Sequence, residues 1–225
     1  MTSELPLGKP VSVPDPVLRP EPRELAGTYV TLTPIALDDI SALYAGTRGT
    51  ENDWMWTYLP YGPFDSETAM RVWAEETFVG GADPMLFTAT QVGGSPVGAG
   101  AMMNIVPEHQ RLEIGHIWFA PSVHGTPVIT EANYLWMKEA FDGLGYRRVE
   151  WKCDSLNARS FAAAKRLGFT FEGIFRNHIV VKGRNRDTAW LSITDAEWPD
   201  RKAKLERWLY ENPDGKLSLR AMNQA

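Results

Sequence analysis

The stretch VEWKCDSLNARSFAAAKRLGFTFEGIFRNH, at residues 149–178, decides the fold. Apolar and polar residues alternate over its first six positions, which is the period-two pattern of a half-buried strand. Asn157 supplies N-cap chemistry for a run of good helix formers, and Gly168 can end that helix as a C-cap. The stretch therefore predicts a strand, a polar turn and a helix, with another strand directly after Gly168.

Hydrophobic periodicity extends this arrangement to both sides. Strands are predicted where apolar residues alternate or lie in short runs between turn signals, at 29–33, 85–90, 96–105, 112–119, 148–154, 171–181 and 188–193. Helices are predicted where apolar residues recur at helical spacing, at 34–47, 66–79, 131–144, 158–167 and 198–210. The expected fold class is therefore α+β, with a central mixed, mostly antiparallel sheet of about seven strands flanked by helices.

Length and composition favour one domain with an N-terminal arm. The chain has 225 residues, which is within the size that a single hydrophobic core supports. Residues 1–25 carry six prolines, too many for a helix or a central strand, and predict an extended arm that lies on the surface or on a second subunit. The domain is expected at 26–211, followed by a loose tail at 212–225.

Charge, cysteine content and hydropathy narrow the function classes. The net charge of −5 gives no sign of the basic surface that nucleic-acid binding needs, so no nucleic acid is expected as a partner. One cysteine excludes an internal disulfide, and neither a secretory signal nor a membrane span is recognisable, so a cytoplasmic protein without membrane contact is expected. The four histidines show no ligand spacing, so no metal is expected.

Asn157 at the start of the predicted helix, with Leu167, Gly168 and Phe169 at its end, gives the chain a resemblance to a known family. These residues resemble the second half of the GNAT superfamily, the acetyl-CoA-dependent N-acetyltransferases. The resemblance is strongest to the branch related to the ribosomal-protein alanine acetyltransferases (RimL-like), and it covers roughly residues 29–208. It implies a GNAT fold in which two central strands splay apart and hold the acyl-pantetheine arm of acetyl-CoA in the gap.

The resemblance also implies where acetyl-CoA binds. The pyrophosphate needs backbone amide groups at a helix N-terminus, and residues 124–131 occupy the position of the family's phosphate loop. Gly125 matches that loop, whereas Pro127 stands where a small residue is usual and has no N–H to donate. The implied cofactor contacts are Ile117, Phe119, His124, Gly125, Thr126, Thr130, Asn157 and Ser160. Two alternatives stay open, since His124 can be a surface residue and Asn157 only an N-cap.

Glu113 falls where several family members keep a carboxylate that takes the proton of the amine, so the resemblance implies a general base there. The alternative is a partly buried acid that pairs with an arginine such as Arg111. Strict alternation along the strand at 112–119 places Glu113 on one face and His116 on the other, which separates the two groups. His116 is either part of the acceptor site or a hydrogen-bonded histidine of the sheet.

The departing thiolate needs a proton donor. Many family members use a tyrosine on the helix at 158–167, but this chain has Ala164 at that position. Ser160 matches the serine of the RimL-like branch and is the implied donor or relay, unless it bonds back to the preceding turn as a mid-helix serine can. Cys153 is not expected to carry an acyl group, because an apolar strand position raises the pKa of a thiol.

Two segments are candidates for acceptor binding. The segment WMWTYLPYGPF, at residues 54–64, contains five aromatic residues and forms either a binding lid or part of the core. Arg176 and His178 can hold a carboxylate of a small acceptor or a cofactor phosphate, unless they are solvated charges paired with Glu172 and Asp187. The expected substrate-binding residues are Trp54, Trp56, Tyr58, His116, Arg176 and His178.

The resemblance implies an enzyme that moves an acetyl group from acetyl-CoA to a primary amine by direct attack. The acceptor is expected to be an N-terminal α-amine of a protein or peptide, or a small-molecule amine. Deprotonating an α-amine at pH 7 costs about 1 kcal/mol, against about 4.6 kcal/mol for a lysine, so an α-amine suits a modest base. Relatives of the branch lead us to expect a homodimer. The alternatives are an acyl-CoA-binding sensor or interaction protein with little transferase activity, and an enzyme with another acyl donor or with a toxin, antibiotic or aminoacyl-nucleotide acceptor.

Overall fold

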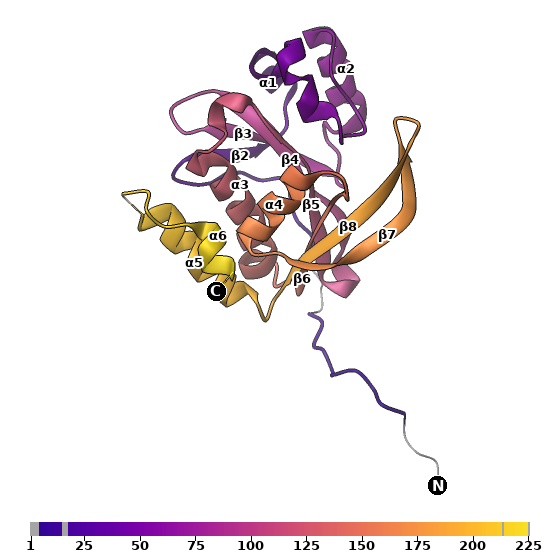
Figure 1. Cartoon of the computed structure of the whole chain (residues 1–225), viewed down its shortest axis with the longest axis vertical. Helices are drawn as coiled ribbons and strands as arrows, with labels where there is room; N and C mark the ends of the chain where they lie inside the picture. Colours follow the sequence, from indigo (N-terminus) through magenta and orange to yellow (C-terminus); the bar gives the residue numbers. More distant parts are fainter. Residues whose placement is uncertain (1–4, 15–17, 213, 225) are drawn as a thin grey trace.

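The computed structural model describes residues 5–14, 18–212 and 214–224, and it forms one open sheet of eight strands (Figure 1). The strands lie in the order β1-β2-β3-β4-β5-β6-β8-β7, and every neighbouring pair is antiparallel except β5 and β6. Their bounds are β1 (Leu25–Ala26), β2 (Val30–Pro34), β3 (Met85–Gln91), β4 (Pro96–Val106), β5 (Arg111–Phe119), β6 (Arg148–Asp154), β7 (Thr170–Val181) and β8 (Arg184–Thr194). The expected α+β fold is confirmed. The additional strand is β1, whose two residues are too few to show a periodicity in the sequence.

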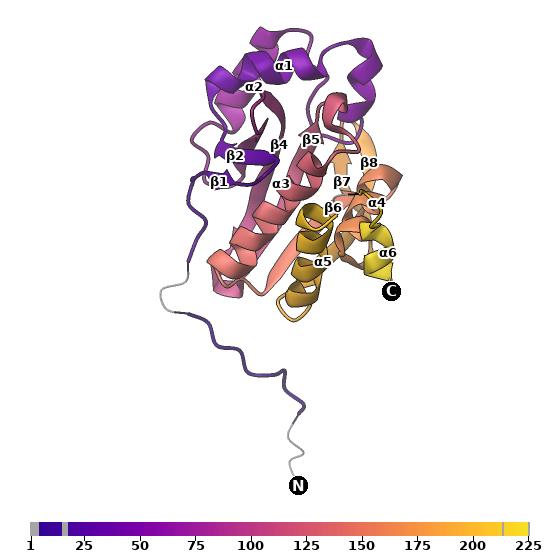
Figure 2. The same ribbon diagram turned by 90° about the vertical axis from the view of Figure 1, so that its left-hand side faces the viewer.

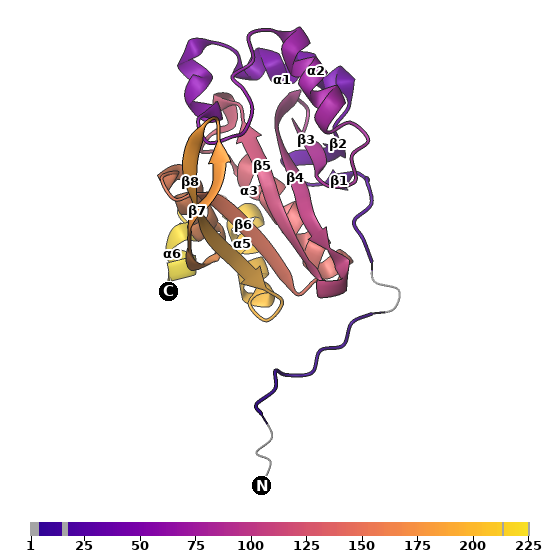
Figure 3. The ribbon, with the colours of Figure 1, turned by 90° about the vertical axis from the view of Figure 1, so that its right-hand side faces the viewer.

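Helices cover the two faces of the sheet unequally. One face carries α3 (Pro127–Lys138), α4 (Ala158–Leu167), α5 (Trp198–Tyr210) and α6 (Leu219–Gln224), and the other carries α1 (Ile40–Thr47) and α2 (Glu67–Thr77). Figure 2 shows α3 and α5 lying across the first face. Figure 3 shows the second face, where α1 and α2 cover only one end of β4 and β5. We call these the α3 face and the α1 face.

The splayed strands expected of a GNAT fold are confirmed at β5 and β6. The two strands pair only from Arg111↔Arg148 to Glu113↔Glu150. Beyond that point β6 remains paired with β8 as far as Asp154↔Thr188, whereas the side of β5 that faces β6 has no strand partner. Backbone groups on that side of β5 are therefore free to bind something other than a strand.

A bulge in β5 overturns the predicted separation of Glu113 and His116. His116 and Ile117 together lie opposite a single residue of β4, between the pairs Ala101↔Gly115 and Ala99↔Trp118, and His116 adopts the left-handed conformation with φ 52°. The extra residue shifts the alternation by one position. Trp118 consequently packs into the core of the α1 face, while Ile117 and Phe119 pack toward the α3 face.

Helix α3 begins four residues earlier than the periodicity predicts. Pro127 occupies its first turn, where the fixed φ of proline suits a helix and the missing N–H would have had no intrahelical acceptor anyway. The last turn of the predicted helix is a π-turn at Glu139–Gly143. Pro127 is therefore compatible with the start of the helix and removes only one of its free amide groups.

The two ends of the chain differ in how they contact the domain. Residues 5–14 are exposed and extend away from the sheet (Figure 1), whereas the Leu18 carbonyl accepts a hydrogen bond from the Tyr146 hydroxyl at 2.9 Å. The segment after α5 is not a loose tail throughout. Leu219 of α6 is 2% exposed, and the Asn223 side chain donates to the Arg166 carbonyl at 2.8 Å. Helix α6 thus closes the end of the core beside α4 and α5.

Candidate active site

A cleft of about 1260 Å³ opens where β5 and β6 part. Its walls come from β5, β6, the N-terminal turn of α3, α4 and the aromatic segment that precedes α2. Strand splaying makes this cleft, because the space that a continuous sheet would fill with ladder hydrogen bonds is left open between two strands. The cleft brings together most of the site residues that the sequence predicted.

The N-terminus of α3 forms the anion-binding end of the cleft. Gly125 precedes it in the left-handed conformation with φ 78°, and Thr126 is the N-cap residue. The Thr126 hydroxyl donates to the Val123 carbonyl at 2.7 Å and does not cap the helix, so the first amide groups after Pro127 have no acceptor among the residues that the structure describes. Free amide groups and the positive end of the helix dipole suit a phosphate.

Two arginines of α4 add positive charge to this end of the cleft. The Arg159 guanidinium lies 4.3 Å from the centre of the Trp54 ring, and Arg166 donates to the Thr130 hydroxyl at 2.9 Å. Both arginines line the cleft, whereas Thr130 is fully buried and contacts the cleft only through Arg166. Sequence reasoning missed both arginines. The signal available in the sequence is that both are basic residues of a helix that opens with Asn157.

His124 lines the cleft mouth, and its Nε2 lies 3.0 Å from the Phe119 carbonyl oxygen. The ring also meets the edge of Trp54, with ring centres 5.8 Å apart. The imidazole is thus within hydrogen-bond distance of the Phe119 carbonyl at the end of β5, a residue expected to contact the cofactor. Ile117 and Phe119 both line the cleft.

The start of α4 forms a second polar point in the cleft. Asn157 is the N-cap, and its side-chain carbonyl accepts from the Ser160 amide at 3.1 Å. The Ser160 hydroxyl accepts a hydrogen bond from the Trp151 indole at 3.0 Å. Burial raises the pKa of the neighbouring Cys153 thiol, in agreement with the expectation that it carries no acyl group. Since Trp151 donates to Ser160, the serine proton is left to point elsewhere.

Glu113 is 5% exposed at the point where β5 and β6 begin to part. Its Oε2 accepts a hydrogen bond from the Asn104 side-chain amide at 2.7 Å and lies 2.8 Å from the Lys152 ammonium. Arg111 pairs with Glu150 instead, at 3.6 Å. The carboxylate is therefore held by a lysine and an amide rather than by the arginine that the sequence suggested, and it faces the cleft on the α1 face.

His116 also lines the cleft on the α1 face, as a consequence of the bulge. Its Nδ1 lies 3.2 Å from the Tyr61 hydroxyl, and the two rings are stacked with centres 5.6 Å apart. Burial and, to a smaller extent, the positive charge of Arg186 lower the pKa of His116 to about 4. The imidazole is therefore neutral at pH 7, and its surroundings disfavour the protonated form.

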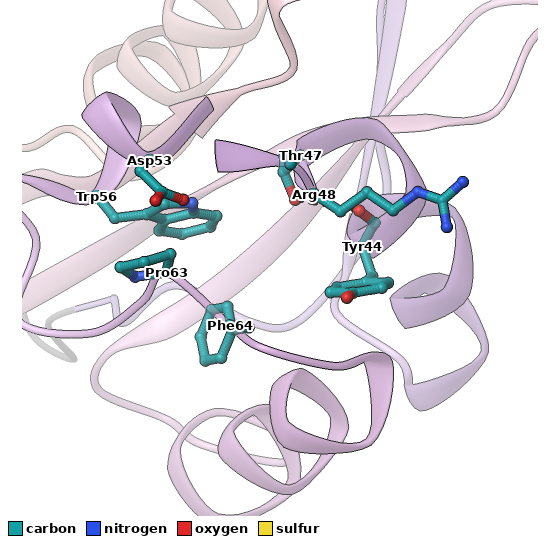
Figure 4. Close-up of a pocket in the computed structure, with 8 residues that line it drawn as sticks. Tyr44, Thr47, Arg48, Asp53, Trp56, Pro63 and Phe64 are labelled. Atoms are coloured by element: carbon teal, nitrogen blue, oxygen red, sulfur yellow. Dashed lines mark hydrogen bonds between the residues drawn. The ribbon is translucent and has the colours of Figure 1, made fainter. Parts of the chain in front are cut away.

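The aromatic segment at residues 54–64 contributes both to the cleft wall and to the core, the two roles that the sequence left open. Trp54 is 41% exposed and lines the cleft together with Tyr58, whose hydroxyl donates to the Leu156 carbonyl at 3.1 Å. Trp56 is 2% exposed and packs edge-on against Phe64 with ring centres 5.3 Å apart. Trp56 also lines a separate hollow of about 10 Å³, which is too small for a ligand. Figure 4 shows it there beside Pro63. Trp56 is thus a core residue that does not reach the cleft.

Arg176 and His178 lie on β7, outside the residues that line the cleft. His178 Nδ1 is 2.9 Å from the Thr188 hydroxyl, and its ring lies against Phe175 and Trp190. The anticipated partners are engaged elsewhere: Glu172 pairs with Arg148, and Asp187 accepts from the Asn177 amide. The β7–β8 register shifts between Phe175 and Ile179, the part of β7 that holds Arg176 and His178.

The comparisons with known proteins agree with this geometry. A family model described as "Acetyltransferase (GNAT) domain" matches residues 30–170. A GCN5-related N-acetyltransferase from Brucella melitensis is 38% identical with a TM-score of 0.88, and the alignment covers 92% of this chain and 97% of that one. A GNAT-family acetyltransferase from Chromobacterium violaceum is 37% identical with a TM-score of 0.77, over 87% and 100% of the two chains. The chain therefore belongs to the GNAT acetyltransferase family.

Two further relatives bear on the ligands. YdaF of Bacillus subtilis, provisionally named a ribosomal N-acetyltransferase, is 31% identical over 109 residues. The match covers 48% of this chain and 59% of YdaF, so the chain spans less than two thirds of that relative. RimJ of Mycobacterium smegmatis, solved with CoA-disulfide, has the same fold, with a TM-score of 0.63 and 22% identity over 82% and 90% of the chains. Acetyl-CoA is the acetyl donor of the family, and the uncapped α3 N-terminus with Arg159 and Arg166 fits its phosphates.

Metal-binding side-chain groups and membrane-spanning helices are both lacking among residues 5–14, 18–212 and 214–224. No group of three or more His, Cys, Asp or Glu side chains there is placed to hold a metal ion. In the same residues, no helix has the length and apolar character needed to cross a bilayer.

Proposed function

We propose that this GNAT acetyltransferase transfers the acetyl group to an α-amine, of a peptide, a protein N-terminus or a small molecule, that enters the cleft from the α1 face. One observation carries the proposal: the bulge in β5 brings Glu113 and His116 to the same face of the cleft. The phosphate-binding end of α3 lies on the other side of β5. Donor and acceptor would thus approach each other through the gap between β5 and β6.

Glu113 is the proposed general base. Its carboxylate is held in place by the Lys152 ammonium and the Asn104 side-chain amide, and it takes the amine proton directly or through water as the nitrogen attacks the acetyl carbon. His116, which sequence reasoning had placed on the opposite face, lines the same face of the cleft as a neutral imidazole, and its low pKa leaves Glu113 as the proposed base. A base of modest strength suits an α-amine, which loses its proton more readily than a lysine.

Ser160 is the proposed proton donor for the departing thiolate. Its hydroxyl lies in the cleft and is held by the Trp151 indole, and it makes no backbone bond to the preceding turn. Ala164 stands at the position of the tyrosine that many family members use. It is fully buried, and its methyl group cannot donate a proton. Ser160 could equally pass on a proton from water, because the departing thiolate needs only one proton as the bond between carbon and sulfur breaks.

The proposed cofactor contacts are Ile117, Phe119, His124, Gly125, Thr126, Asn157 and Ser160, with Thr130 acting through Arg166. Acetyl-CoA supplies the thioester, and the protein supplies its position relative to the amine, which is the larger part of catalysis in such reactions. Trp54 and Tyr58 are proposed to close the cleft mouth beside the acceptor, tied to α4 by the contacts with Arg159 and Leu156.

Three further features are proposals. The RimL-like branch, with a ribosomal-protein N-terminus as one possible acceptor, is supported by the likeness to YdaF. A homodimer is supported by apolar side chains that edge strand β7 leaves uncovered, namely Phe171, Ile174, Phe175, Ile179 and Val180, each at least 40% exposed. A cytoplasmic location is supported by the single cysteine, which is free and buried.

Calorimetric titration with acetyl-CoA, followed by mass spectrometry of a panel of aminoacyl amides and peptides, tests the proposal. The expected result is saturable binding and an acceptor that gains one acetyl group at its α-amine. Binding without any acetylated product would favour the sensor alternative. Absence of binding would contradict the assignment of the cleft to acetyl-CoA.

A further inference from the structure

Arg186 is a cation that the proposed mechanism leaves without a role. It lies on β8, two residues before Thr188, where the pairing of β8 with β6 has ended, and it lines the cleft. It is half-buried, and its Nε is buried without a hydrogen-bond partner. An arginine in this setting leaves a strong donor unsatisfied unless a ligand supplies an acceptor.

The acids in the cleft do not neutralise Arg186. Glu113 is engaged by Lys152 and Asn104, and Asp154 accepts from the Leu156 amide at 2.8 Å. Within residues 5–14, 18–212 and 214–224, no carboxylate forms an ion pair with Arg186. The neighbouring Asp187 is occupied by the Asn177 amide and the Asn185 side chain. The guanidinium charge is therefore free to act on a ligand.

Strand alternation places Arg186 on the acceptor side of the cleft. Trp190 is four residues further along β8 and so shares its face, and the Lys152 ammonium lies over the Trp190 ring, 3.9 Å from its centre. Lys152 in turn pairs with Glu113. Arg186, Lys152 and Glu113 therefore line one face, the α1 face, while the next residues of β8 in the alternation, Ala189 and Leu191, pack into the core of the α3 face.

The charge of Arg186 reaches the reacting region. It acts to lower the pKa of His116 and of Cys153, which line the cleft from β5 and β6, so Arg186 lies near both splayed strands. The proposed phosphate-binding groups lie elsewhere, at the start of α3 and on α4. A guanidinium beside the proposed base, away from the phosphate end, is placed to contact the acceptor rather than the donor.

We propose that Arg186 binds an acidic group of the acceptor, so that the preferred substrate is an amine that carries a carboxylate close to its α-amine. This inference rests on the proposed function and names its substrate class. Two sources of the carboxylate fit the same chemistry: the α-carboxylate of a free amino acid, and an acidic side chain near the N-terminus of a peptide. Arginine suits either one, since its planar fork can bind both oxygens of a carboxylate.

Matched acceptors separate these cases. Alanine is compared with alaninamide, and the amide of Ala-Glu with the amide of Ala-Gln, by free-thiol release with acetyl-CoA. The enzymes are wild type, Arg186→Gln, Arg186→Lys and a control, Arg184→Gln, which alters an exposed arginine of the same strand that does not line the cleft. The affinity for acetyl-CoA is measured calorimetrically for each variant.

Wild type and Arg184→Gln are expected to favour the acidic member of one pair by about tenfold or more in kcat/KM, the scale of a hydrogen bond to a charged group. Arg186→Gln is expected to bring that ratio to about one and Arg186→Lys to an intermediate value, with acetyl-CoA affinity unchanged. Which pair responds identifies the source of the carboxylate.

Four outcomes would overturn the inference. Equal use of acidic and neutral acceptors by wild type, with both acetylated, removes the preference but leaves the proposed function intact. A preference that persists in Arg186→Gln assigns it to another residue. Loss of acetyl-CoA affinity in Arg186→Gln makes the arginine a donor contact. If no amine is acetylated although acetyl-CoA binds, the proposed function fails and this inference fails with it.

Discussion

Replacing Lys152 by methionine should destabilise the protein through the pair that fixes the proposed base. The Lys152 ammonium lies 2.8 Å from Glu113 and 3.4 Å from Glu150, and its side chain is 13% exposed. Methionine keeps an apolar chain of similar length over Trp190, but it removes the charge. Glu150 retains Arg148 at 2.9 Å, whereas Glu113 retains only the Asn104 amide. The variant therefore leaves one buried carboxylate without a cation.

Breaking a buried ion pair by removing one partner costs about 3–5 kcal/mol, because the remaining charge is buried and uncompensated. The lower end applies here, since the Asn104 side chain still donates a hydrogen bond to Glu113. A loss of about 3 kcal/mol lowers the Tm of a domain of this size by about 6–12 °C.

Thermal unfolding measures the first effect, with Lys165→Met as the matched control, because Lys165 is exposed on α4 and forms no ion pair among the described residues. The double variant Lys152→Met with Glu113→Gln should lose less stability than the two single variants together, because the second change removes the stranded charge. A Tm within about 2 °C of the control, or strictly additive losses, would refute the argument that this pair holds the base.

Three further predictions concern other groups of the cleft. Burial and the charge of Arg186 lower the pKa of His116 from its ordinary value of 6.5 to about 4 in the folded protein. The unfolded chain therefore binds a proton that the folded protein does not, and stability should fall as pH drops from about 6.5 towards 4, by at most about 3 kcal/mol. Urea titrations at several pH values should show this fall, and a less steep one in His116→Gln. Arg159→Ala should weaken acetyl-CoA binding about tenfold, with an effect that shrinks at high salt, in calorimetry; unchanged affinity would place the phosphates elsewhere. Cys153, whose thiol pKa is raised by burial, should react with a disulfide reagent at pH 8 far more slowly than a free thiol does, and rapid labelling of the folded protein would contradict the burial of its sulfur.

The parts of the fold that could be predicted are those determined by residues close together in the sequence. The strand before Asn157, the helix it caps and the glycine that ends it follow from alternation, helix propensity and capping, and the structure has them at the expected positions. The same holds for α2, which begins where the Ser66 hydroxyl accepts from the Ala69 amide. Helix α6 escaped prediction because it is short and its place depends on contacts with α4 and α5.

The site was harder to predict, because its geometry depends on register. Alternation assigned Glu113 and His116 to opposite faces, and one bulged residue with positive φ reversed that assignment. Lys152 is 39 positions from Glu113 in the sequence and becomes its partner only because β5 and β6 pair in parallel just before they separate. Arg186 reaches the cleft from β8, a strand that does not pair with β5. Such contacts cannot be read from local pattern.

The rate of free-thiol release by Glu113→Gln, against wild type and the exposed control Glu108→Gln, tests the central claim most directly. The account predicts that kcat/KM for an α-amine acceptor falls by about 100-fold or more in Glu113→Gln, the usual scale for loss of a general base. It also predicts that acetyl-CoA affinity stays the same and that Glu108→Gln behaves as wild type. Equal rates in Glu113→Gln and Glu108→Gln would contradict the assignment of Glu113 as the base on the acceptor face of the cleft.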